Sequence, residues 1–144
     1  METKEKIWTK TELNQLQYEI IGAAIEVHKH LGPGLLESVY HKCMKYELTL
    51  RGINFESEFR TPINYKDMEE ADEESLRCDL LVENIILVEL KSVLAFVPIF
   101  ETILMSYMRL SEKPKGLLIN FNCLNIVDGG YKSFVNDIYR RLPD

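Results

Sequence analysis

The stretch CDLLVENIILVELK, residues 78–91, decides the fold. It consists of two apolar runs separated by the short polar sequence Glu83-Asn84, with charged side chains near its two ends. Side chains on a β-strand point alternately to opposite faces, so each run has one face that is entirely apolar. These faces are Cys78, Leu80 and Val82 in the first run and Ile86, Val88 and Leu90 in the second. The stretch therefore predicts a β-hairpin that buries both faces together.

The apolar faces also predict the register of the hairpin. A slip of one residue would turn charged side chains toward the core, so like faces must pair. With a loop at residues 83–85, three pairs meet this condition: Cys78 with Leu90, Leu80 with Val88, and Val82 with Ile86. The same register places Asp79 opposite Glu89 and Arg77 opposite Lys91 on the second face.

The two opposed carboxylates predict a cation between them. Directly opposed side chains have Cβ atoms about 4.5–5.5 Å apart, so Asp79 and Glu89 would repel each other strongly. A hard divalent cation such as Mg²⁺ binds carboxylate oxygens and would remove this repulsion. Lys91 lies two residues beyond Glu89 on the same face, where its ammonium would orient a water molecule or neutralise a phosphate.

The alternative is a surface lattice of ion pairs made by Arg77, Asp79, Glu89 and Lys91, because structural ion pairs also gather acids and bases. Three large apolar side chains on the same face argue against full solvation: Leu81, Ile85 and Leu87. From the residues of this hairpin alone, both interpretations stay open.

Two helices are predicted before the hairpin. The first begins with the capping-box sequence Thr9-Lys10-Thr11-Glu12 and ends at Gly32. The second starts at Gly32-Pro33-Gly34 and stops at Gly52. Its expected inward face consists of Leu36, Val39, Cys43, Tyr46 and Leu50. Residues 53–65 alternate loosely and predict strands that break near Pro62.

A helix, a strand and a second helix are predicted after the hairpin. The first of these helices begins at Pro98 and ends before Lys113. Residues 117–121, LLINF, predict a strand buried on both faces, followed by an edge strand and a turn at residues 122–130. The closing helix is expected to carry Tyr131, Phe134, Val135 and Ile138. This order of elements predicts an α/β or α+β fold, a mixed sheet flanked by helices.

Length and composition predict one domain over residues 1–144, with residues 1–10 as a flexible N-terminal segment. The chain of 144 residues is 46% hydrophobic, which is enough to bury a sizeable core. No apolar run reaches the ~18 residues of a membrane span, and the first residues are too polar for a signal peptide, so we expect a cytoplasmic protein. The three scattered cysteines predict neither a disulfide framework nor a zinc site.

The net charge of −6 argues against a generally basic surface for nucleic acid. Six carboxylates lie between Asp67 and Glu74, however, and removing their six negative charges leaves a net charge of zero. A local basic patch elsewhere is therefore compatible with the composition. A candidate basic edge, which we expect to be ordinary solvated surface, consists of Lys113, Lys115, Lys132, Arg140 and Arg141.

Two motifs resemble known nuclease sequences. Asp79, nine intervening residues and then Glu89-Leu90-Lys91 resemble the catalytic signature of the PD-(D/E)XK nuclease superfamily. Gly34-Leu35-Leu36-Glu37-Ser38-Val39-Tyr40 resembles the motif of the GxxExxY protein family, a branch of that superfamily. The segments LRCDLLVENIILVELKSV and GLLINFN are similar to the same family, so the resemblance runs from about Ile20 to Asn136.

The resemblance implies a restriction-endonuclease-like core whose metal site lies on one strand face. It implies that Asp79 and Glu89 bind Mg²⁺ or Mn²⁺, that Lys91 is the catalytic lysine, and that Glu37 completes or supports the metal site. The implied activity is hydrolysis of phosphodiester bonds in DNA, with RNA as a second candidate. From the residues alone, the helix dipole also accounts for an acid at Glu37. Tyr40 is expected to support the site from the same helix face, with its hydroxyl bound to Glu37.

One segment departs from the family pattern. Relatives are expected to carry a glutamine in the helix after the Glu-x-Lys strand and often a histidine three residues earlier, where this chain has Ile103 and Phe100. Isoleucine forms no hydrogen bond to water or phosphate, and Glu101, the nearest polar residue, points to another helix face. A second hypothesis therefore stands beside the nuclease, namely a non-catalytic binding or interaction module with the same fold.

The sequence leaves several properties of the substrate and the assembly open. Nothing in it distinguishes DNA from RNA, and no motif indicates a base preference, a pathway or an oligomeric state. Phosphate contacts normally supply much of the affinity for nucleic acid. A small chain with little basic surface is therefore expected to need a homodimer or another partner for efficient binding.

Overall fold

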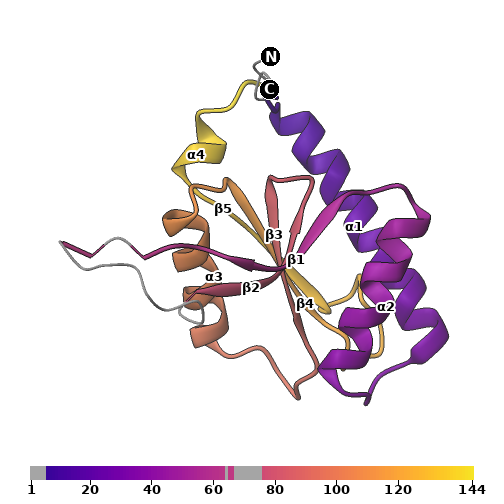
Figure 1. Ribbon diagram of the computed structural model, residues 1–144. Helices are drawn as coiled ribbons and strands as arrows, with labels where there is room; N and C mark the ends of the chain where they lie inside the picture. The colour runs from indigo at the N-terminus through magenta and orange to yellow at the C-terminus, as the bar shows by residue number, and fades with distance from the viewer. Residues whose placement is uncertain (1–5, 64, 67–75) are drawn as a thin grey trace.

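The computed structural model describes residues 6–63, 65–66 and 76–144, and five strands in these residues form one sheet (Figure 1). The strands, side by side in this order, are β1 (Phe55–Arg60), β2 (Arg77–Val82), β3 (Ile86–Lys91), β4 (Lys115–Asn120) and β5 (Tyr131–Val135). β3 and β4 are parallel, and the other neighbouring pairs are antiparallel. The mixed sheet is therefore confirmed. The acidic run between Asp67 and Glu74 lies outside the described residues.

Helices cover both faces of the sheet (Figure 1). The helices are α1 (Lys10–Leu31), α2 (Glu37–Leu50), α3 (Pro98–Leu110) and the single turn α4 (Asp137–Arg140). α1 and α2 pack on the face that includes Leu80 and Val88, while α3 packs on the face that includes Leu81 and Leu87. The predicted α+β arrangement, a sheet between helices, is confirmed. No helix in the described part of the chain has the length and hydrophobicity of a membrane span.

The central hairpin, β2 and β3, has the predicted register near its turn. Two predicted pairs are confirmed: Leu80 with Val88, and Val82 with Ile86. The turn occupies residues 83–85, and Glu83 and Asn84 adopt positive φ angles of 50° and 58° there. Asparagine tolerates this left-handed conformation better than most residues with a side chain, which favours a turn at this place.

The two hairpin strands separate beyond Leu80 and Val88. β2 continues alongside β1, and β3 continues alongside β4. Three predicted strand pairs are therefore wrong: Asp79 with Glu89, Cys78 with Leu90, and Arg77 with Lys91. The reason lies in Asp79 and Glu89, whose side chains accept backbone hydrogen bonds that a continued ladder would use.

The starts of α1 and α3 agree with their sequence signals. The Thr9 hydroxyl accepts a hydrogen bond from the Glu12 amide at 3.0 Å, and the Glu12 carboxylate accepts one from the Thr9 amide at 3.1 Å. This is the predicted capping box, and Gly32, with φ of 68°, ends α1 as predicted. α3 begins with Pro98 in its first turn.

The predicted inward face of α2 is wrong. The residues of α2 that are buried are Tyr40, Met44 and Leu48, which recur every four residues. Of the expected face, Cys43 is half-buried, and the other four are exposed: Leu36, Val39, Tyr46 and Leu50. The helix has two overlapping apolar stripes, and Tyr40 decides between them because its ring stacks on the buried ring of Phe121 with centroids 4.5 Å apart.

The C-terminal part of the chain also differs from its prediction. Residues 131–135 form β5, not a helix, because they pair antiparallel with β4. The helix that follows, α4, has only four residues, and the Asn136 side chain caps it by accepting a hydrogen bond from the Tyr139 amide. Residues 122–130 form bends and turns instead of the expected edge strand. Aromatic and β-branched residues such as Tyr131 and Val135 fit a half-buried strand as well as a short helix, so their spacing misled the prediction.

Candidate functional site

The candidate site lies where β2 and β3 separate. The Asp79 amide donates a hydrogen bond to Glu89 Oε1 at 3.0 Å. The Leu90 amide donates one to Asp79 Oδ2 at 2.7 Å. Each carboxylate thus accepts from the backbone of the opposite strand, in place of the carbonyl that a regular ladder would supply. The sequence placed Asp79 and Glu89 opposite each other, and the structure brings their side chains together.

The Glu89 carboxyl has a strongly perturbed acidity. Burial and the neighbouring Asp79 carboxylate together raise its pKa to about 7, although the Cys78 thiol, the Asp79 amide and Lys91 act in the opposite direction. Burial also raises the pKa of the Cys78 thiol, and the Glu89 charge adds to that increase. A buried carboxyl whose charged form is disfavoured by burial and by a neighbouring carboxylate is typical of a functional site.

Lys91 brings a positive charge to this carboxylate pair. Its Nζ lies 3.9 Å from Glu89 Oε2. The same ammonium lies 4.6 Å from the ring centroid of Phe100, in the first turn of α3. A cation held over an aromatic face is stabilised by the ring quadrupole. The lysine is therefore positioned between the carboxylates and α3.

Glu37 approaches the same site from α2. It is the first residue of that helix, and its side chain is exposed. Loss of hydration raises the pKa of Glu37, the Lys91 charge lowers it and the Asp79 charge raises it. Glu37 is thus close enough for the charges of Lys91 and Asp79 to change its pKa. Among the described residues, however, no group of three or more His, Cys, Asp or Glu side chains is close enough to hold a metal ion.

Tyr40 does not bind Glu37, contrary to the sequence prediction. It is fully buried, its hydroxyl donates to the Gly32 carbonyl at 2.5 Å, and it accepts from the Leu35 amide at 3.2 Å. The prediction failed because Tyr40 faces the core and Glu37 does not. Tyr40 instead fixes the connection between α1 and α2, which leads directly into Glu37.

The donor set fits a hard divalent cation. Asp79 and Glu89 offer carboxylate oxygens, which are the ligands that Mg²⁺ and Mn²⁺ prefer. A dication would also favour the charged form of Glu89, against the burial and the Asp79 repulsion that together raise its pKa. The residues present are therefore compatible with a metal ion held by two carboxylates, with water filling the other positions.

Two neighbours of the site were missed from the sequence. Burial and the nearby Glu89 charge raise the pKa of Tyr107, so this α3 residue lies beside the carboxylate pair. Phe100 contacts Lys91, whereas Ile103 is 39% exposed. No local motif marks such contacts, because they arise only when α3 packs on the sheet. Glu101 points elsewhere, as expected, and binds Lys132 at 2.6 Å.

The candidate basic edge is not a continuous cationic surface. Lys115 is buried, and burial lowers its pKa. Other members have local partners: Lys113 donates to the Asn84 carbonyl, Lys132 binds Glu101 and Arg140 binds Asp137. Lys132 and Arg140 are therefore paired with carboxylates and Lys115 is withdrawn from the surface, which leaves Lys113 and Arg141 as the cations of this edge.

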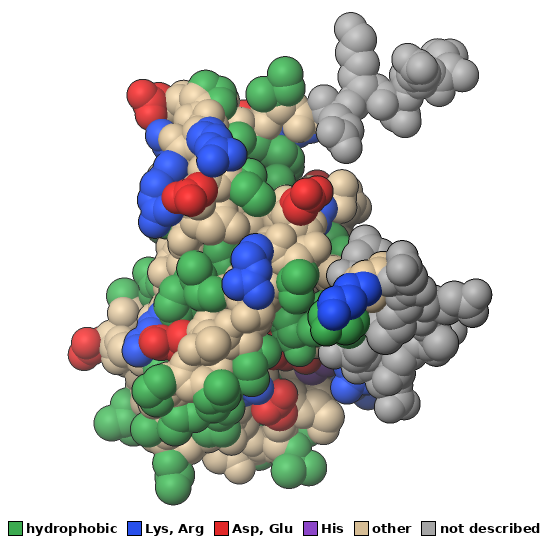
Figure 2. Space-filling model, turned by 90° about the vertical axis from the view of Figure 1, so that its left-hand side faces the viewer, with side chains coloured by type: hydrophobic (Ala, Val, Ile, Leu, Met, Phe, Trp, Pro, Cys, Tyr) green, Lys and Arg blue, Asp and Glu red, His purple; other side chains and the backbone are tan. Residues whose placement is uncertain are grey.

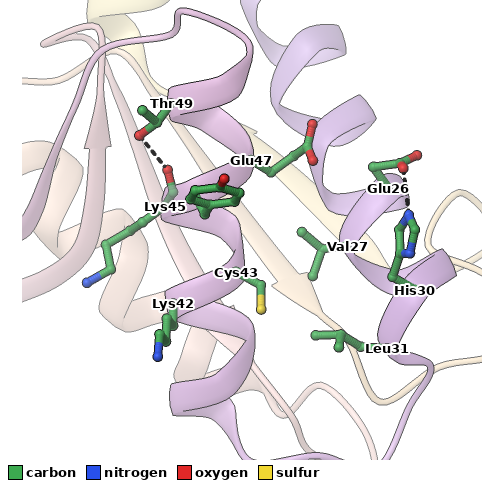
Figure 3. Close-up of a pocket in the computed structure, with 10 residues that line it drawn as sticks. Glu26, Val27, His30, Leu31, Lys42, Cys43, Lys45, Glu47 and Thr49 are labelled. Carbon is green, nitrogen blue, oxygen red and sulfur yellow. Dashed lines mark hydrogen bonds and ion pairs between the residues drawn. The ribbon is translucent and has the colours of Figure 1, made fainter.

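A cleft of about 660 Å³ lies away from this site, between α1 and α2 (Figure 3). Val27, Leu31 and Cys43 form its apolar part, and the polar side chains of Glu26, His30, Lys42 and Glu47 stand around it (Figure 3). None of the described residues that line it belongs to the carboxylate site. The volume of a cleft alone therefore does not identify the candidate catalytic site in this protein.

The comparisons with known proteins agree with the site geometry. The family model of the PD-(D/E)XK nuclease superfamily matches residues 14–133, which is most of the chain and includes the carboxylates and the lysine. Comparisons with curated proteins and with solved structures found no significant match. With the mixed sheet and the acidic pair at the strand opening, this match shows that the chain belongs to the PD-(D/E)XK nuclease superfamily.

Proposed function

We propose that this protein is a divalent-metal-dependent nuclease that hydrolyses phosphodiester bonds in DNA, with RNA as the second candidate substrate. Membership of the superfamily supports a nuclease-type function in general, and nucleases of this superfamily generally use divalent metal ions. The observation that carries the proposal is the pair Asp79 and Glu89, held together at the strand opening with the Lys91 ammonium 3.9 Å from Glu89.

Each residue of the site has a proposed role. Asp79 and Glu89 would hold Mg²⁺ or Mn²⁺, and Glu37 would support that ion from the start of α2. The bound ion would supply Lewis-acid activation and neutralise phosphate charge. Lys91 would orient the attacking water and stabilise the negative charge that builds on the phosphoryl oxygens in the transition state. Tyr40 would keep Glu37 in place through the connection that it fixes.

The finer classification rests on the α1–α2 connection and the start of α2. The sequence from Gly34 to Tyr40 resembles the GxxExxY motif, and it contributes the Glu37 carboxyl and the buried Tyr40 hydroxyl. We therefore assign the chain to the GxxExxY branch. We also propose that residues 1–144 form one nuclease domain, that it works in the cytoplasm, and that it acts on nucleic acid as a homodimer.

A second candidate function is a non-catalytic nucleic-acid-binding module. The observation that favours it is the α3 wall of the site, where Phe100 contacts Lys91, while Ile103 is 39% exposed and Glu101 points away from the site to Lys132. Such a wall offers no amide or imidazole to position water or phosphate. The carboxylate pair and the lysine favour catalysis, so the nuclease is the first proposal.

Cleavage of labelled single-stranded DNA, duplex DNA and RNA in Mg²⁺ or Mn²⁺ tests the nuclease proposal. Glu89→Ala and Lys91→Ala should each lower the cleavage rate by at least about 100-fold, because the first removes a proposed metal ligand and the second removes the group that orients water and stabilises the transition state. The matched control is the Glu101–Lys132 pair, an acid and a lysine 2.6 Å apart outside the site. Glu101→Ala and Lys132→Ala should cleave like the wild type.

The outcomes separate the two functions. Metal-dependent cleavage that is lost in both site variants and kept in both control variants supports the nuclease. Nucleic-acid and metal binding without cleavage under any of these conditions would leave the binding module as the function. Cleavage that survives Glu89→Ala would point to a contaminating nuclease and would refute the proposed site.

A further inference from the structure

A second cleft adjoins the carboxylate site at the ends of β3 and β4. Its volume is about 610 Å³, within the range of ligand pockets in proteins. Three segments line it: the α1–α2 connection at Leu35, the β3–α3 connection from Ser92 to Val97, and the residue Asn122 after β4. Phe100 closes it from the first turn of α3.

This cleft lies beside the proposed catalytic centre. Phe100, which lines the cleft, carries the Lys91 ammonium 4.6 Å from its ring centroid. Ser92 follows Lys91 directly, and its hydroxyl donates to the Leu35 carbonyl at 2.6 Å. Leu35 lies two residues before Glu37. A nucleic-acid strand with one phosphate at Lys91 would therefore bring an adjacent nucleotide to the cleft.

The walls of the cleft are suited to the flat face of a base and not to a phosphate. None of the described residues that line it is charged. Leu94 is 96% exposed, Val97 is 41% exposed and Leu35 is 39% exposed, so a large apolar surface is open to water. Figure 2 shows hydrophobic side chains gathered on the lower part of the face that carries α3. Exposed apolar surface of this kind marks a place where something binds.

The β3–α3 connection is held in place before any ligand arrives. Asn120 is 5% exposed and binds this connection through both the oxygen and the nitrogen of its side-chain amide. Its Oδ1 accepts from the Val93 amide at 3.0 Å, and its Nδ2 donates to the Val93 carbonyl at 2.9 Å. Asn122 Nδ2 donates to the same carbonyl at 3.1 Å. Because these hydrogen bonds already order the β3–α3 connection, it loses less conformational entropy when a ligand binds.

We infer that this cleft binds one unpaired nucleobase next to the scissile phosphate, so that the substrate is single-stranded or locally unpaired nucleic acid. The inference rests on the proposed nuclease function and adds the class of substrate to it. Bases inside a duplex are stacked and paired, and their faces are not accessible to a side chain. An unpaired base is free to place its face against the Phe100 ring and the apolar side chains of Leu94 and Val97, and stacking on an aromatic ring accepts every base.

Binding to fluorescent oligonucleotides tests this inference without any need for cleavage. The measurement is fluorescence anisotropy in Ca²⁺, with a single strand and with the same strand annealed to its complement. The wild type should bind the single strand more tightly than the duplex. Leu94→Ser should weaken single-strand binding by roughly 10-fold or more, since it removes an apolar contact of leucine size. Leu94→Phe should restore it.

The chain offers a matched control in Leu124. Leu94 and Leu124 are both 96% exposed, but Leu124 does not line the cleft. Leu124→Ser should therefore bind the single strand like the wild type. Equal affinities of Leu94→Ser and Leu124→Ser, or tighter binding of the duplex by the wild type, would overturn the inference.

Two further readouts separate this inference from its alternatives. If Leu94→Ser instead abolishes self-association in sedimentation velocity and leaves single-strand binding unchanged, a second copy covers the cleft and the inference is wrong. If single-strand binding depends on Leu94 but the protein never cleaves nucleic acid, the base-binding cleft is supported and the proposed nuclease function is wrong. If the protein cleaves duplex DNA and Leu94→Ser leaves that cleavage unchanged, the nuclease function is supported and the base-binding cleft is wrong.

Discussion

Asp79 and Glu89 each combine two roles, since their carboxylates carry charge and also accept backbone hydrogen bonds across the strand opening. Asparagine and glutamine at these positions keep a carbonyl oxygen as acceptor and remove the charge. Amide variants therefore separate the electrostatic role from the structural one. Alanine removes both roles, so it serves only where loss of activity is the readout.

Glu89→Gln should change how stability depends on pH. The pKa of Glu89 is about 7 in the folded state against an ordinary 4.5, so the folded state binds this proton more tightly than the unfolded state. The stabilisation from protonated Glu89 is fully present below about pH 4.5 and is lost as pH rises through about 7. The loss is on the order of 3 kcal/mol in metal-free buffer. Glu89→Gln should lack this decrease.

Urea unfolding in EDTA at pH values below and above this window measures the difference between wild type and variant. Glu101→Gln is the matched control, because its parent carboxylate binds Lys132 on the surface and lies outside the site. This control should keep the wild-type decrease. If wild type and Glu89→Gln lose the same free energy of unfolding between the two pH values, burial and Asp79 do not perturb Glu89 in the way described.

At the scale of single elements, α2 shows how far a sequence pattern can be read. Apolar residues recur at helical intervals on two of its faces, and nothing local ranks the stripe of Tyr40, Met44 and Leu48 above the other. The buried face is determined by tertiary packing, because the Tyr40 ring stacks on Phe121, the residue directly after β4. The hairpin was predictable because a strand has only two faces, and one of them carried every charge.

Tyr40→Phe should destabilise the protein through the α1–α2 connection. The substitution removes one donor to the Gly32 carbonyl and one acceptor for the Leu35 amide, both in part-buried hydrogen bonds. The expected loss in the free energy of unfolding is about 1–3 kcal/mol, the cost of unpaired buried polar groups. Tyr46→Phe is the matched control on the same helix, since Tyr46 is 68% exposed and should change stability by less than about 0.5 kcal/mol.

Urea denaturation of the two tyrosine variants checks this prediction. Equal stabilities for Tyr40→Phe and Tyr46→Phe would mean that the buried hydroxyl contributes nothing to the connection. A loss confined to Tyr40→Phe supports the role of this residue as a brace for the segment that leads to Glu37.

At the scale of the whole molecule, the site is assembled from segments far apart in the sequence. Asp79, Glu89 and Lys91 come from one hairpin, and their proximity follows from strand register. The part played by Glu37 was implied only by the resemblance, because a helix-start acid has an ordinary explanation in the helix dipole. Phe100 and Tyr107 reach the site through the packing of α3, which no pattern in that helix specifies.

The central claim is that Asp79 and Glu89 form a site for one divalent cation. Calorimetric titration with Mn²⁺ at about pH 6, in two buffers that differ in ionisation enthalpy, tests it most directly. Because Glu89 is largely protonated below its pKa of about 7, binding should release about one proton there and almost none at about pH 8.5. Glu89→Gln should bind far more weakly and release no proton. Binding of equal affinity in wild type and Glu89→Gln, with no proton released by either, would assign the Mn²⁺ to other carboxylates of the chain and contradict the account.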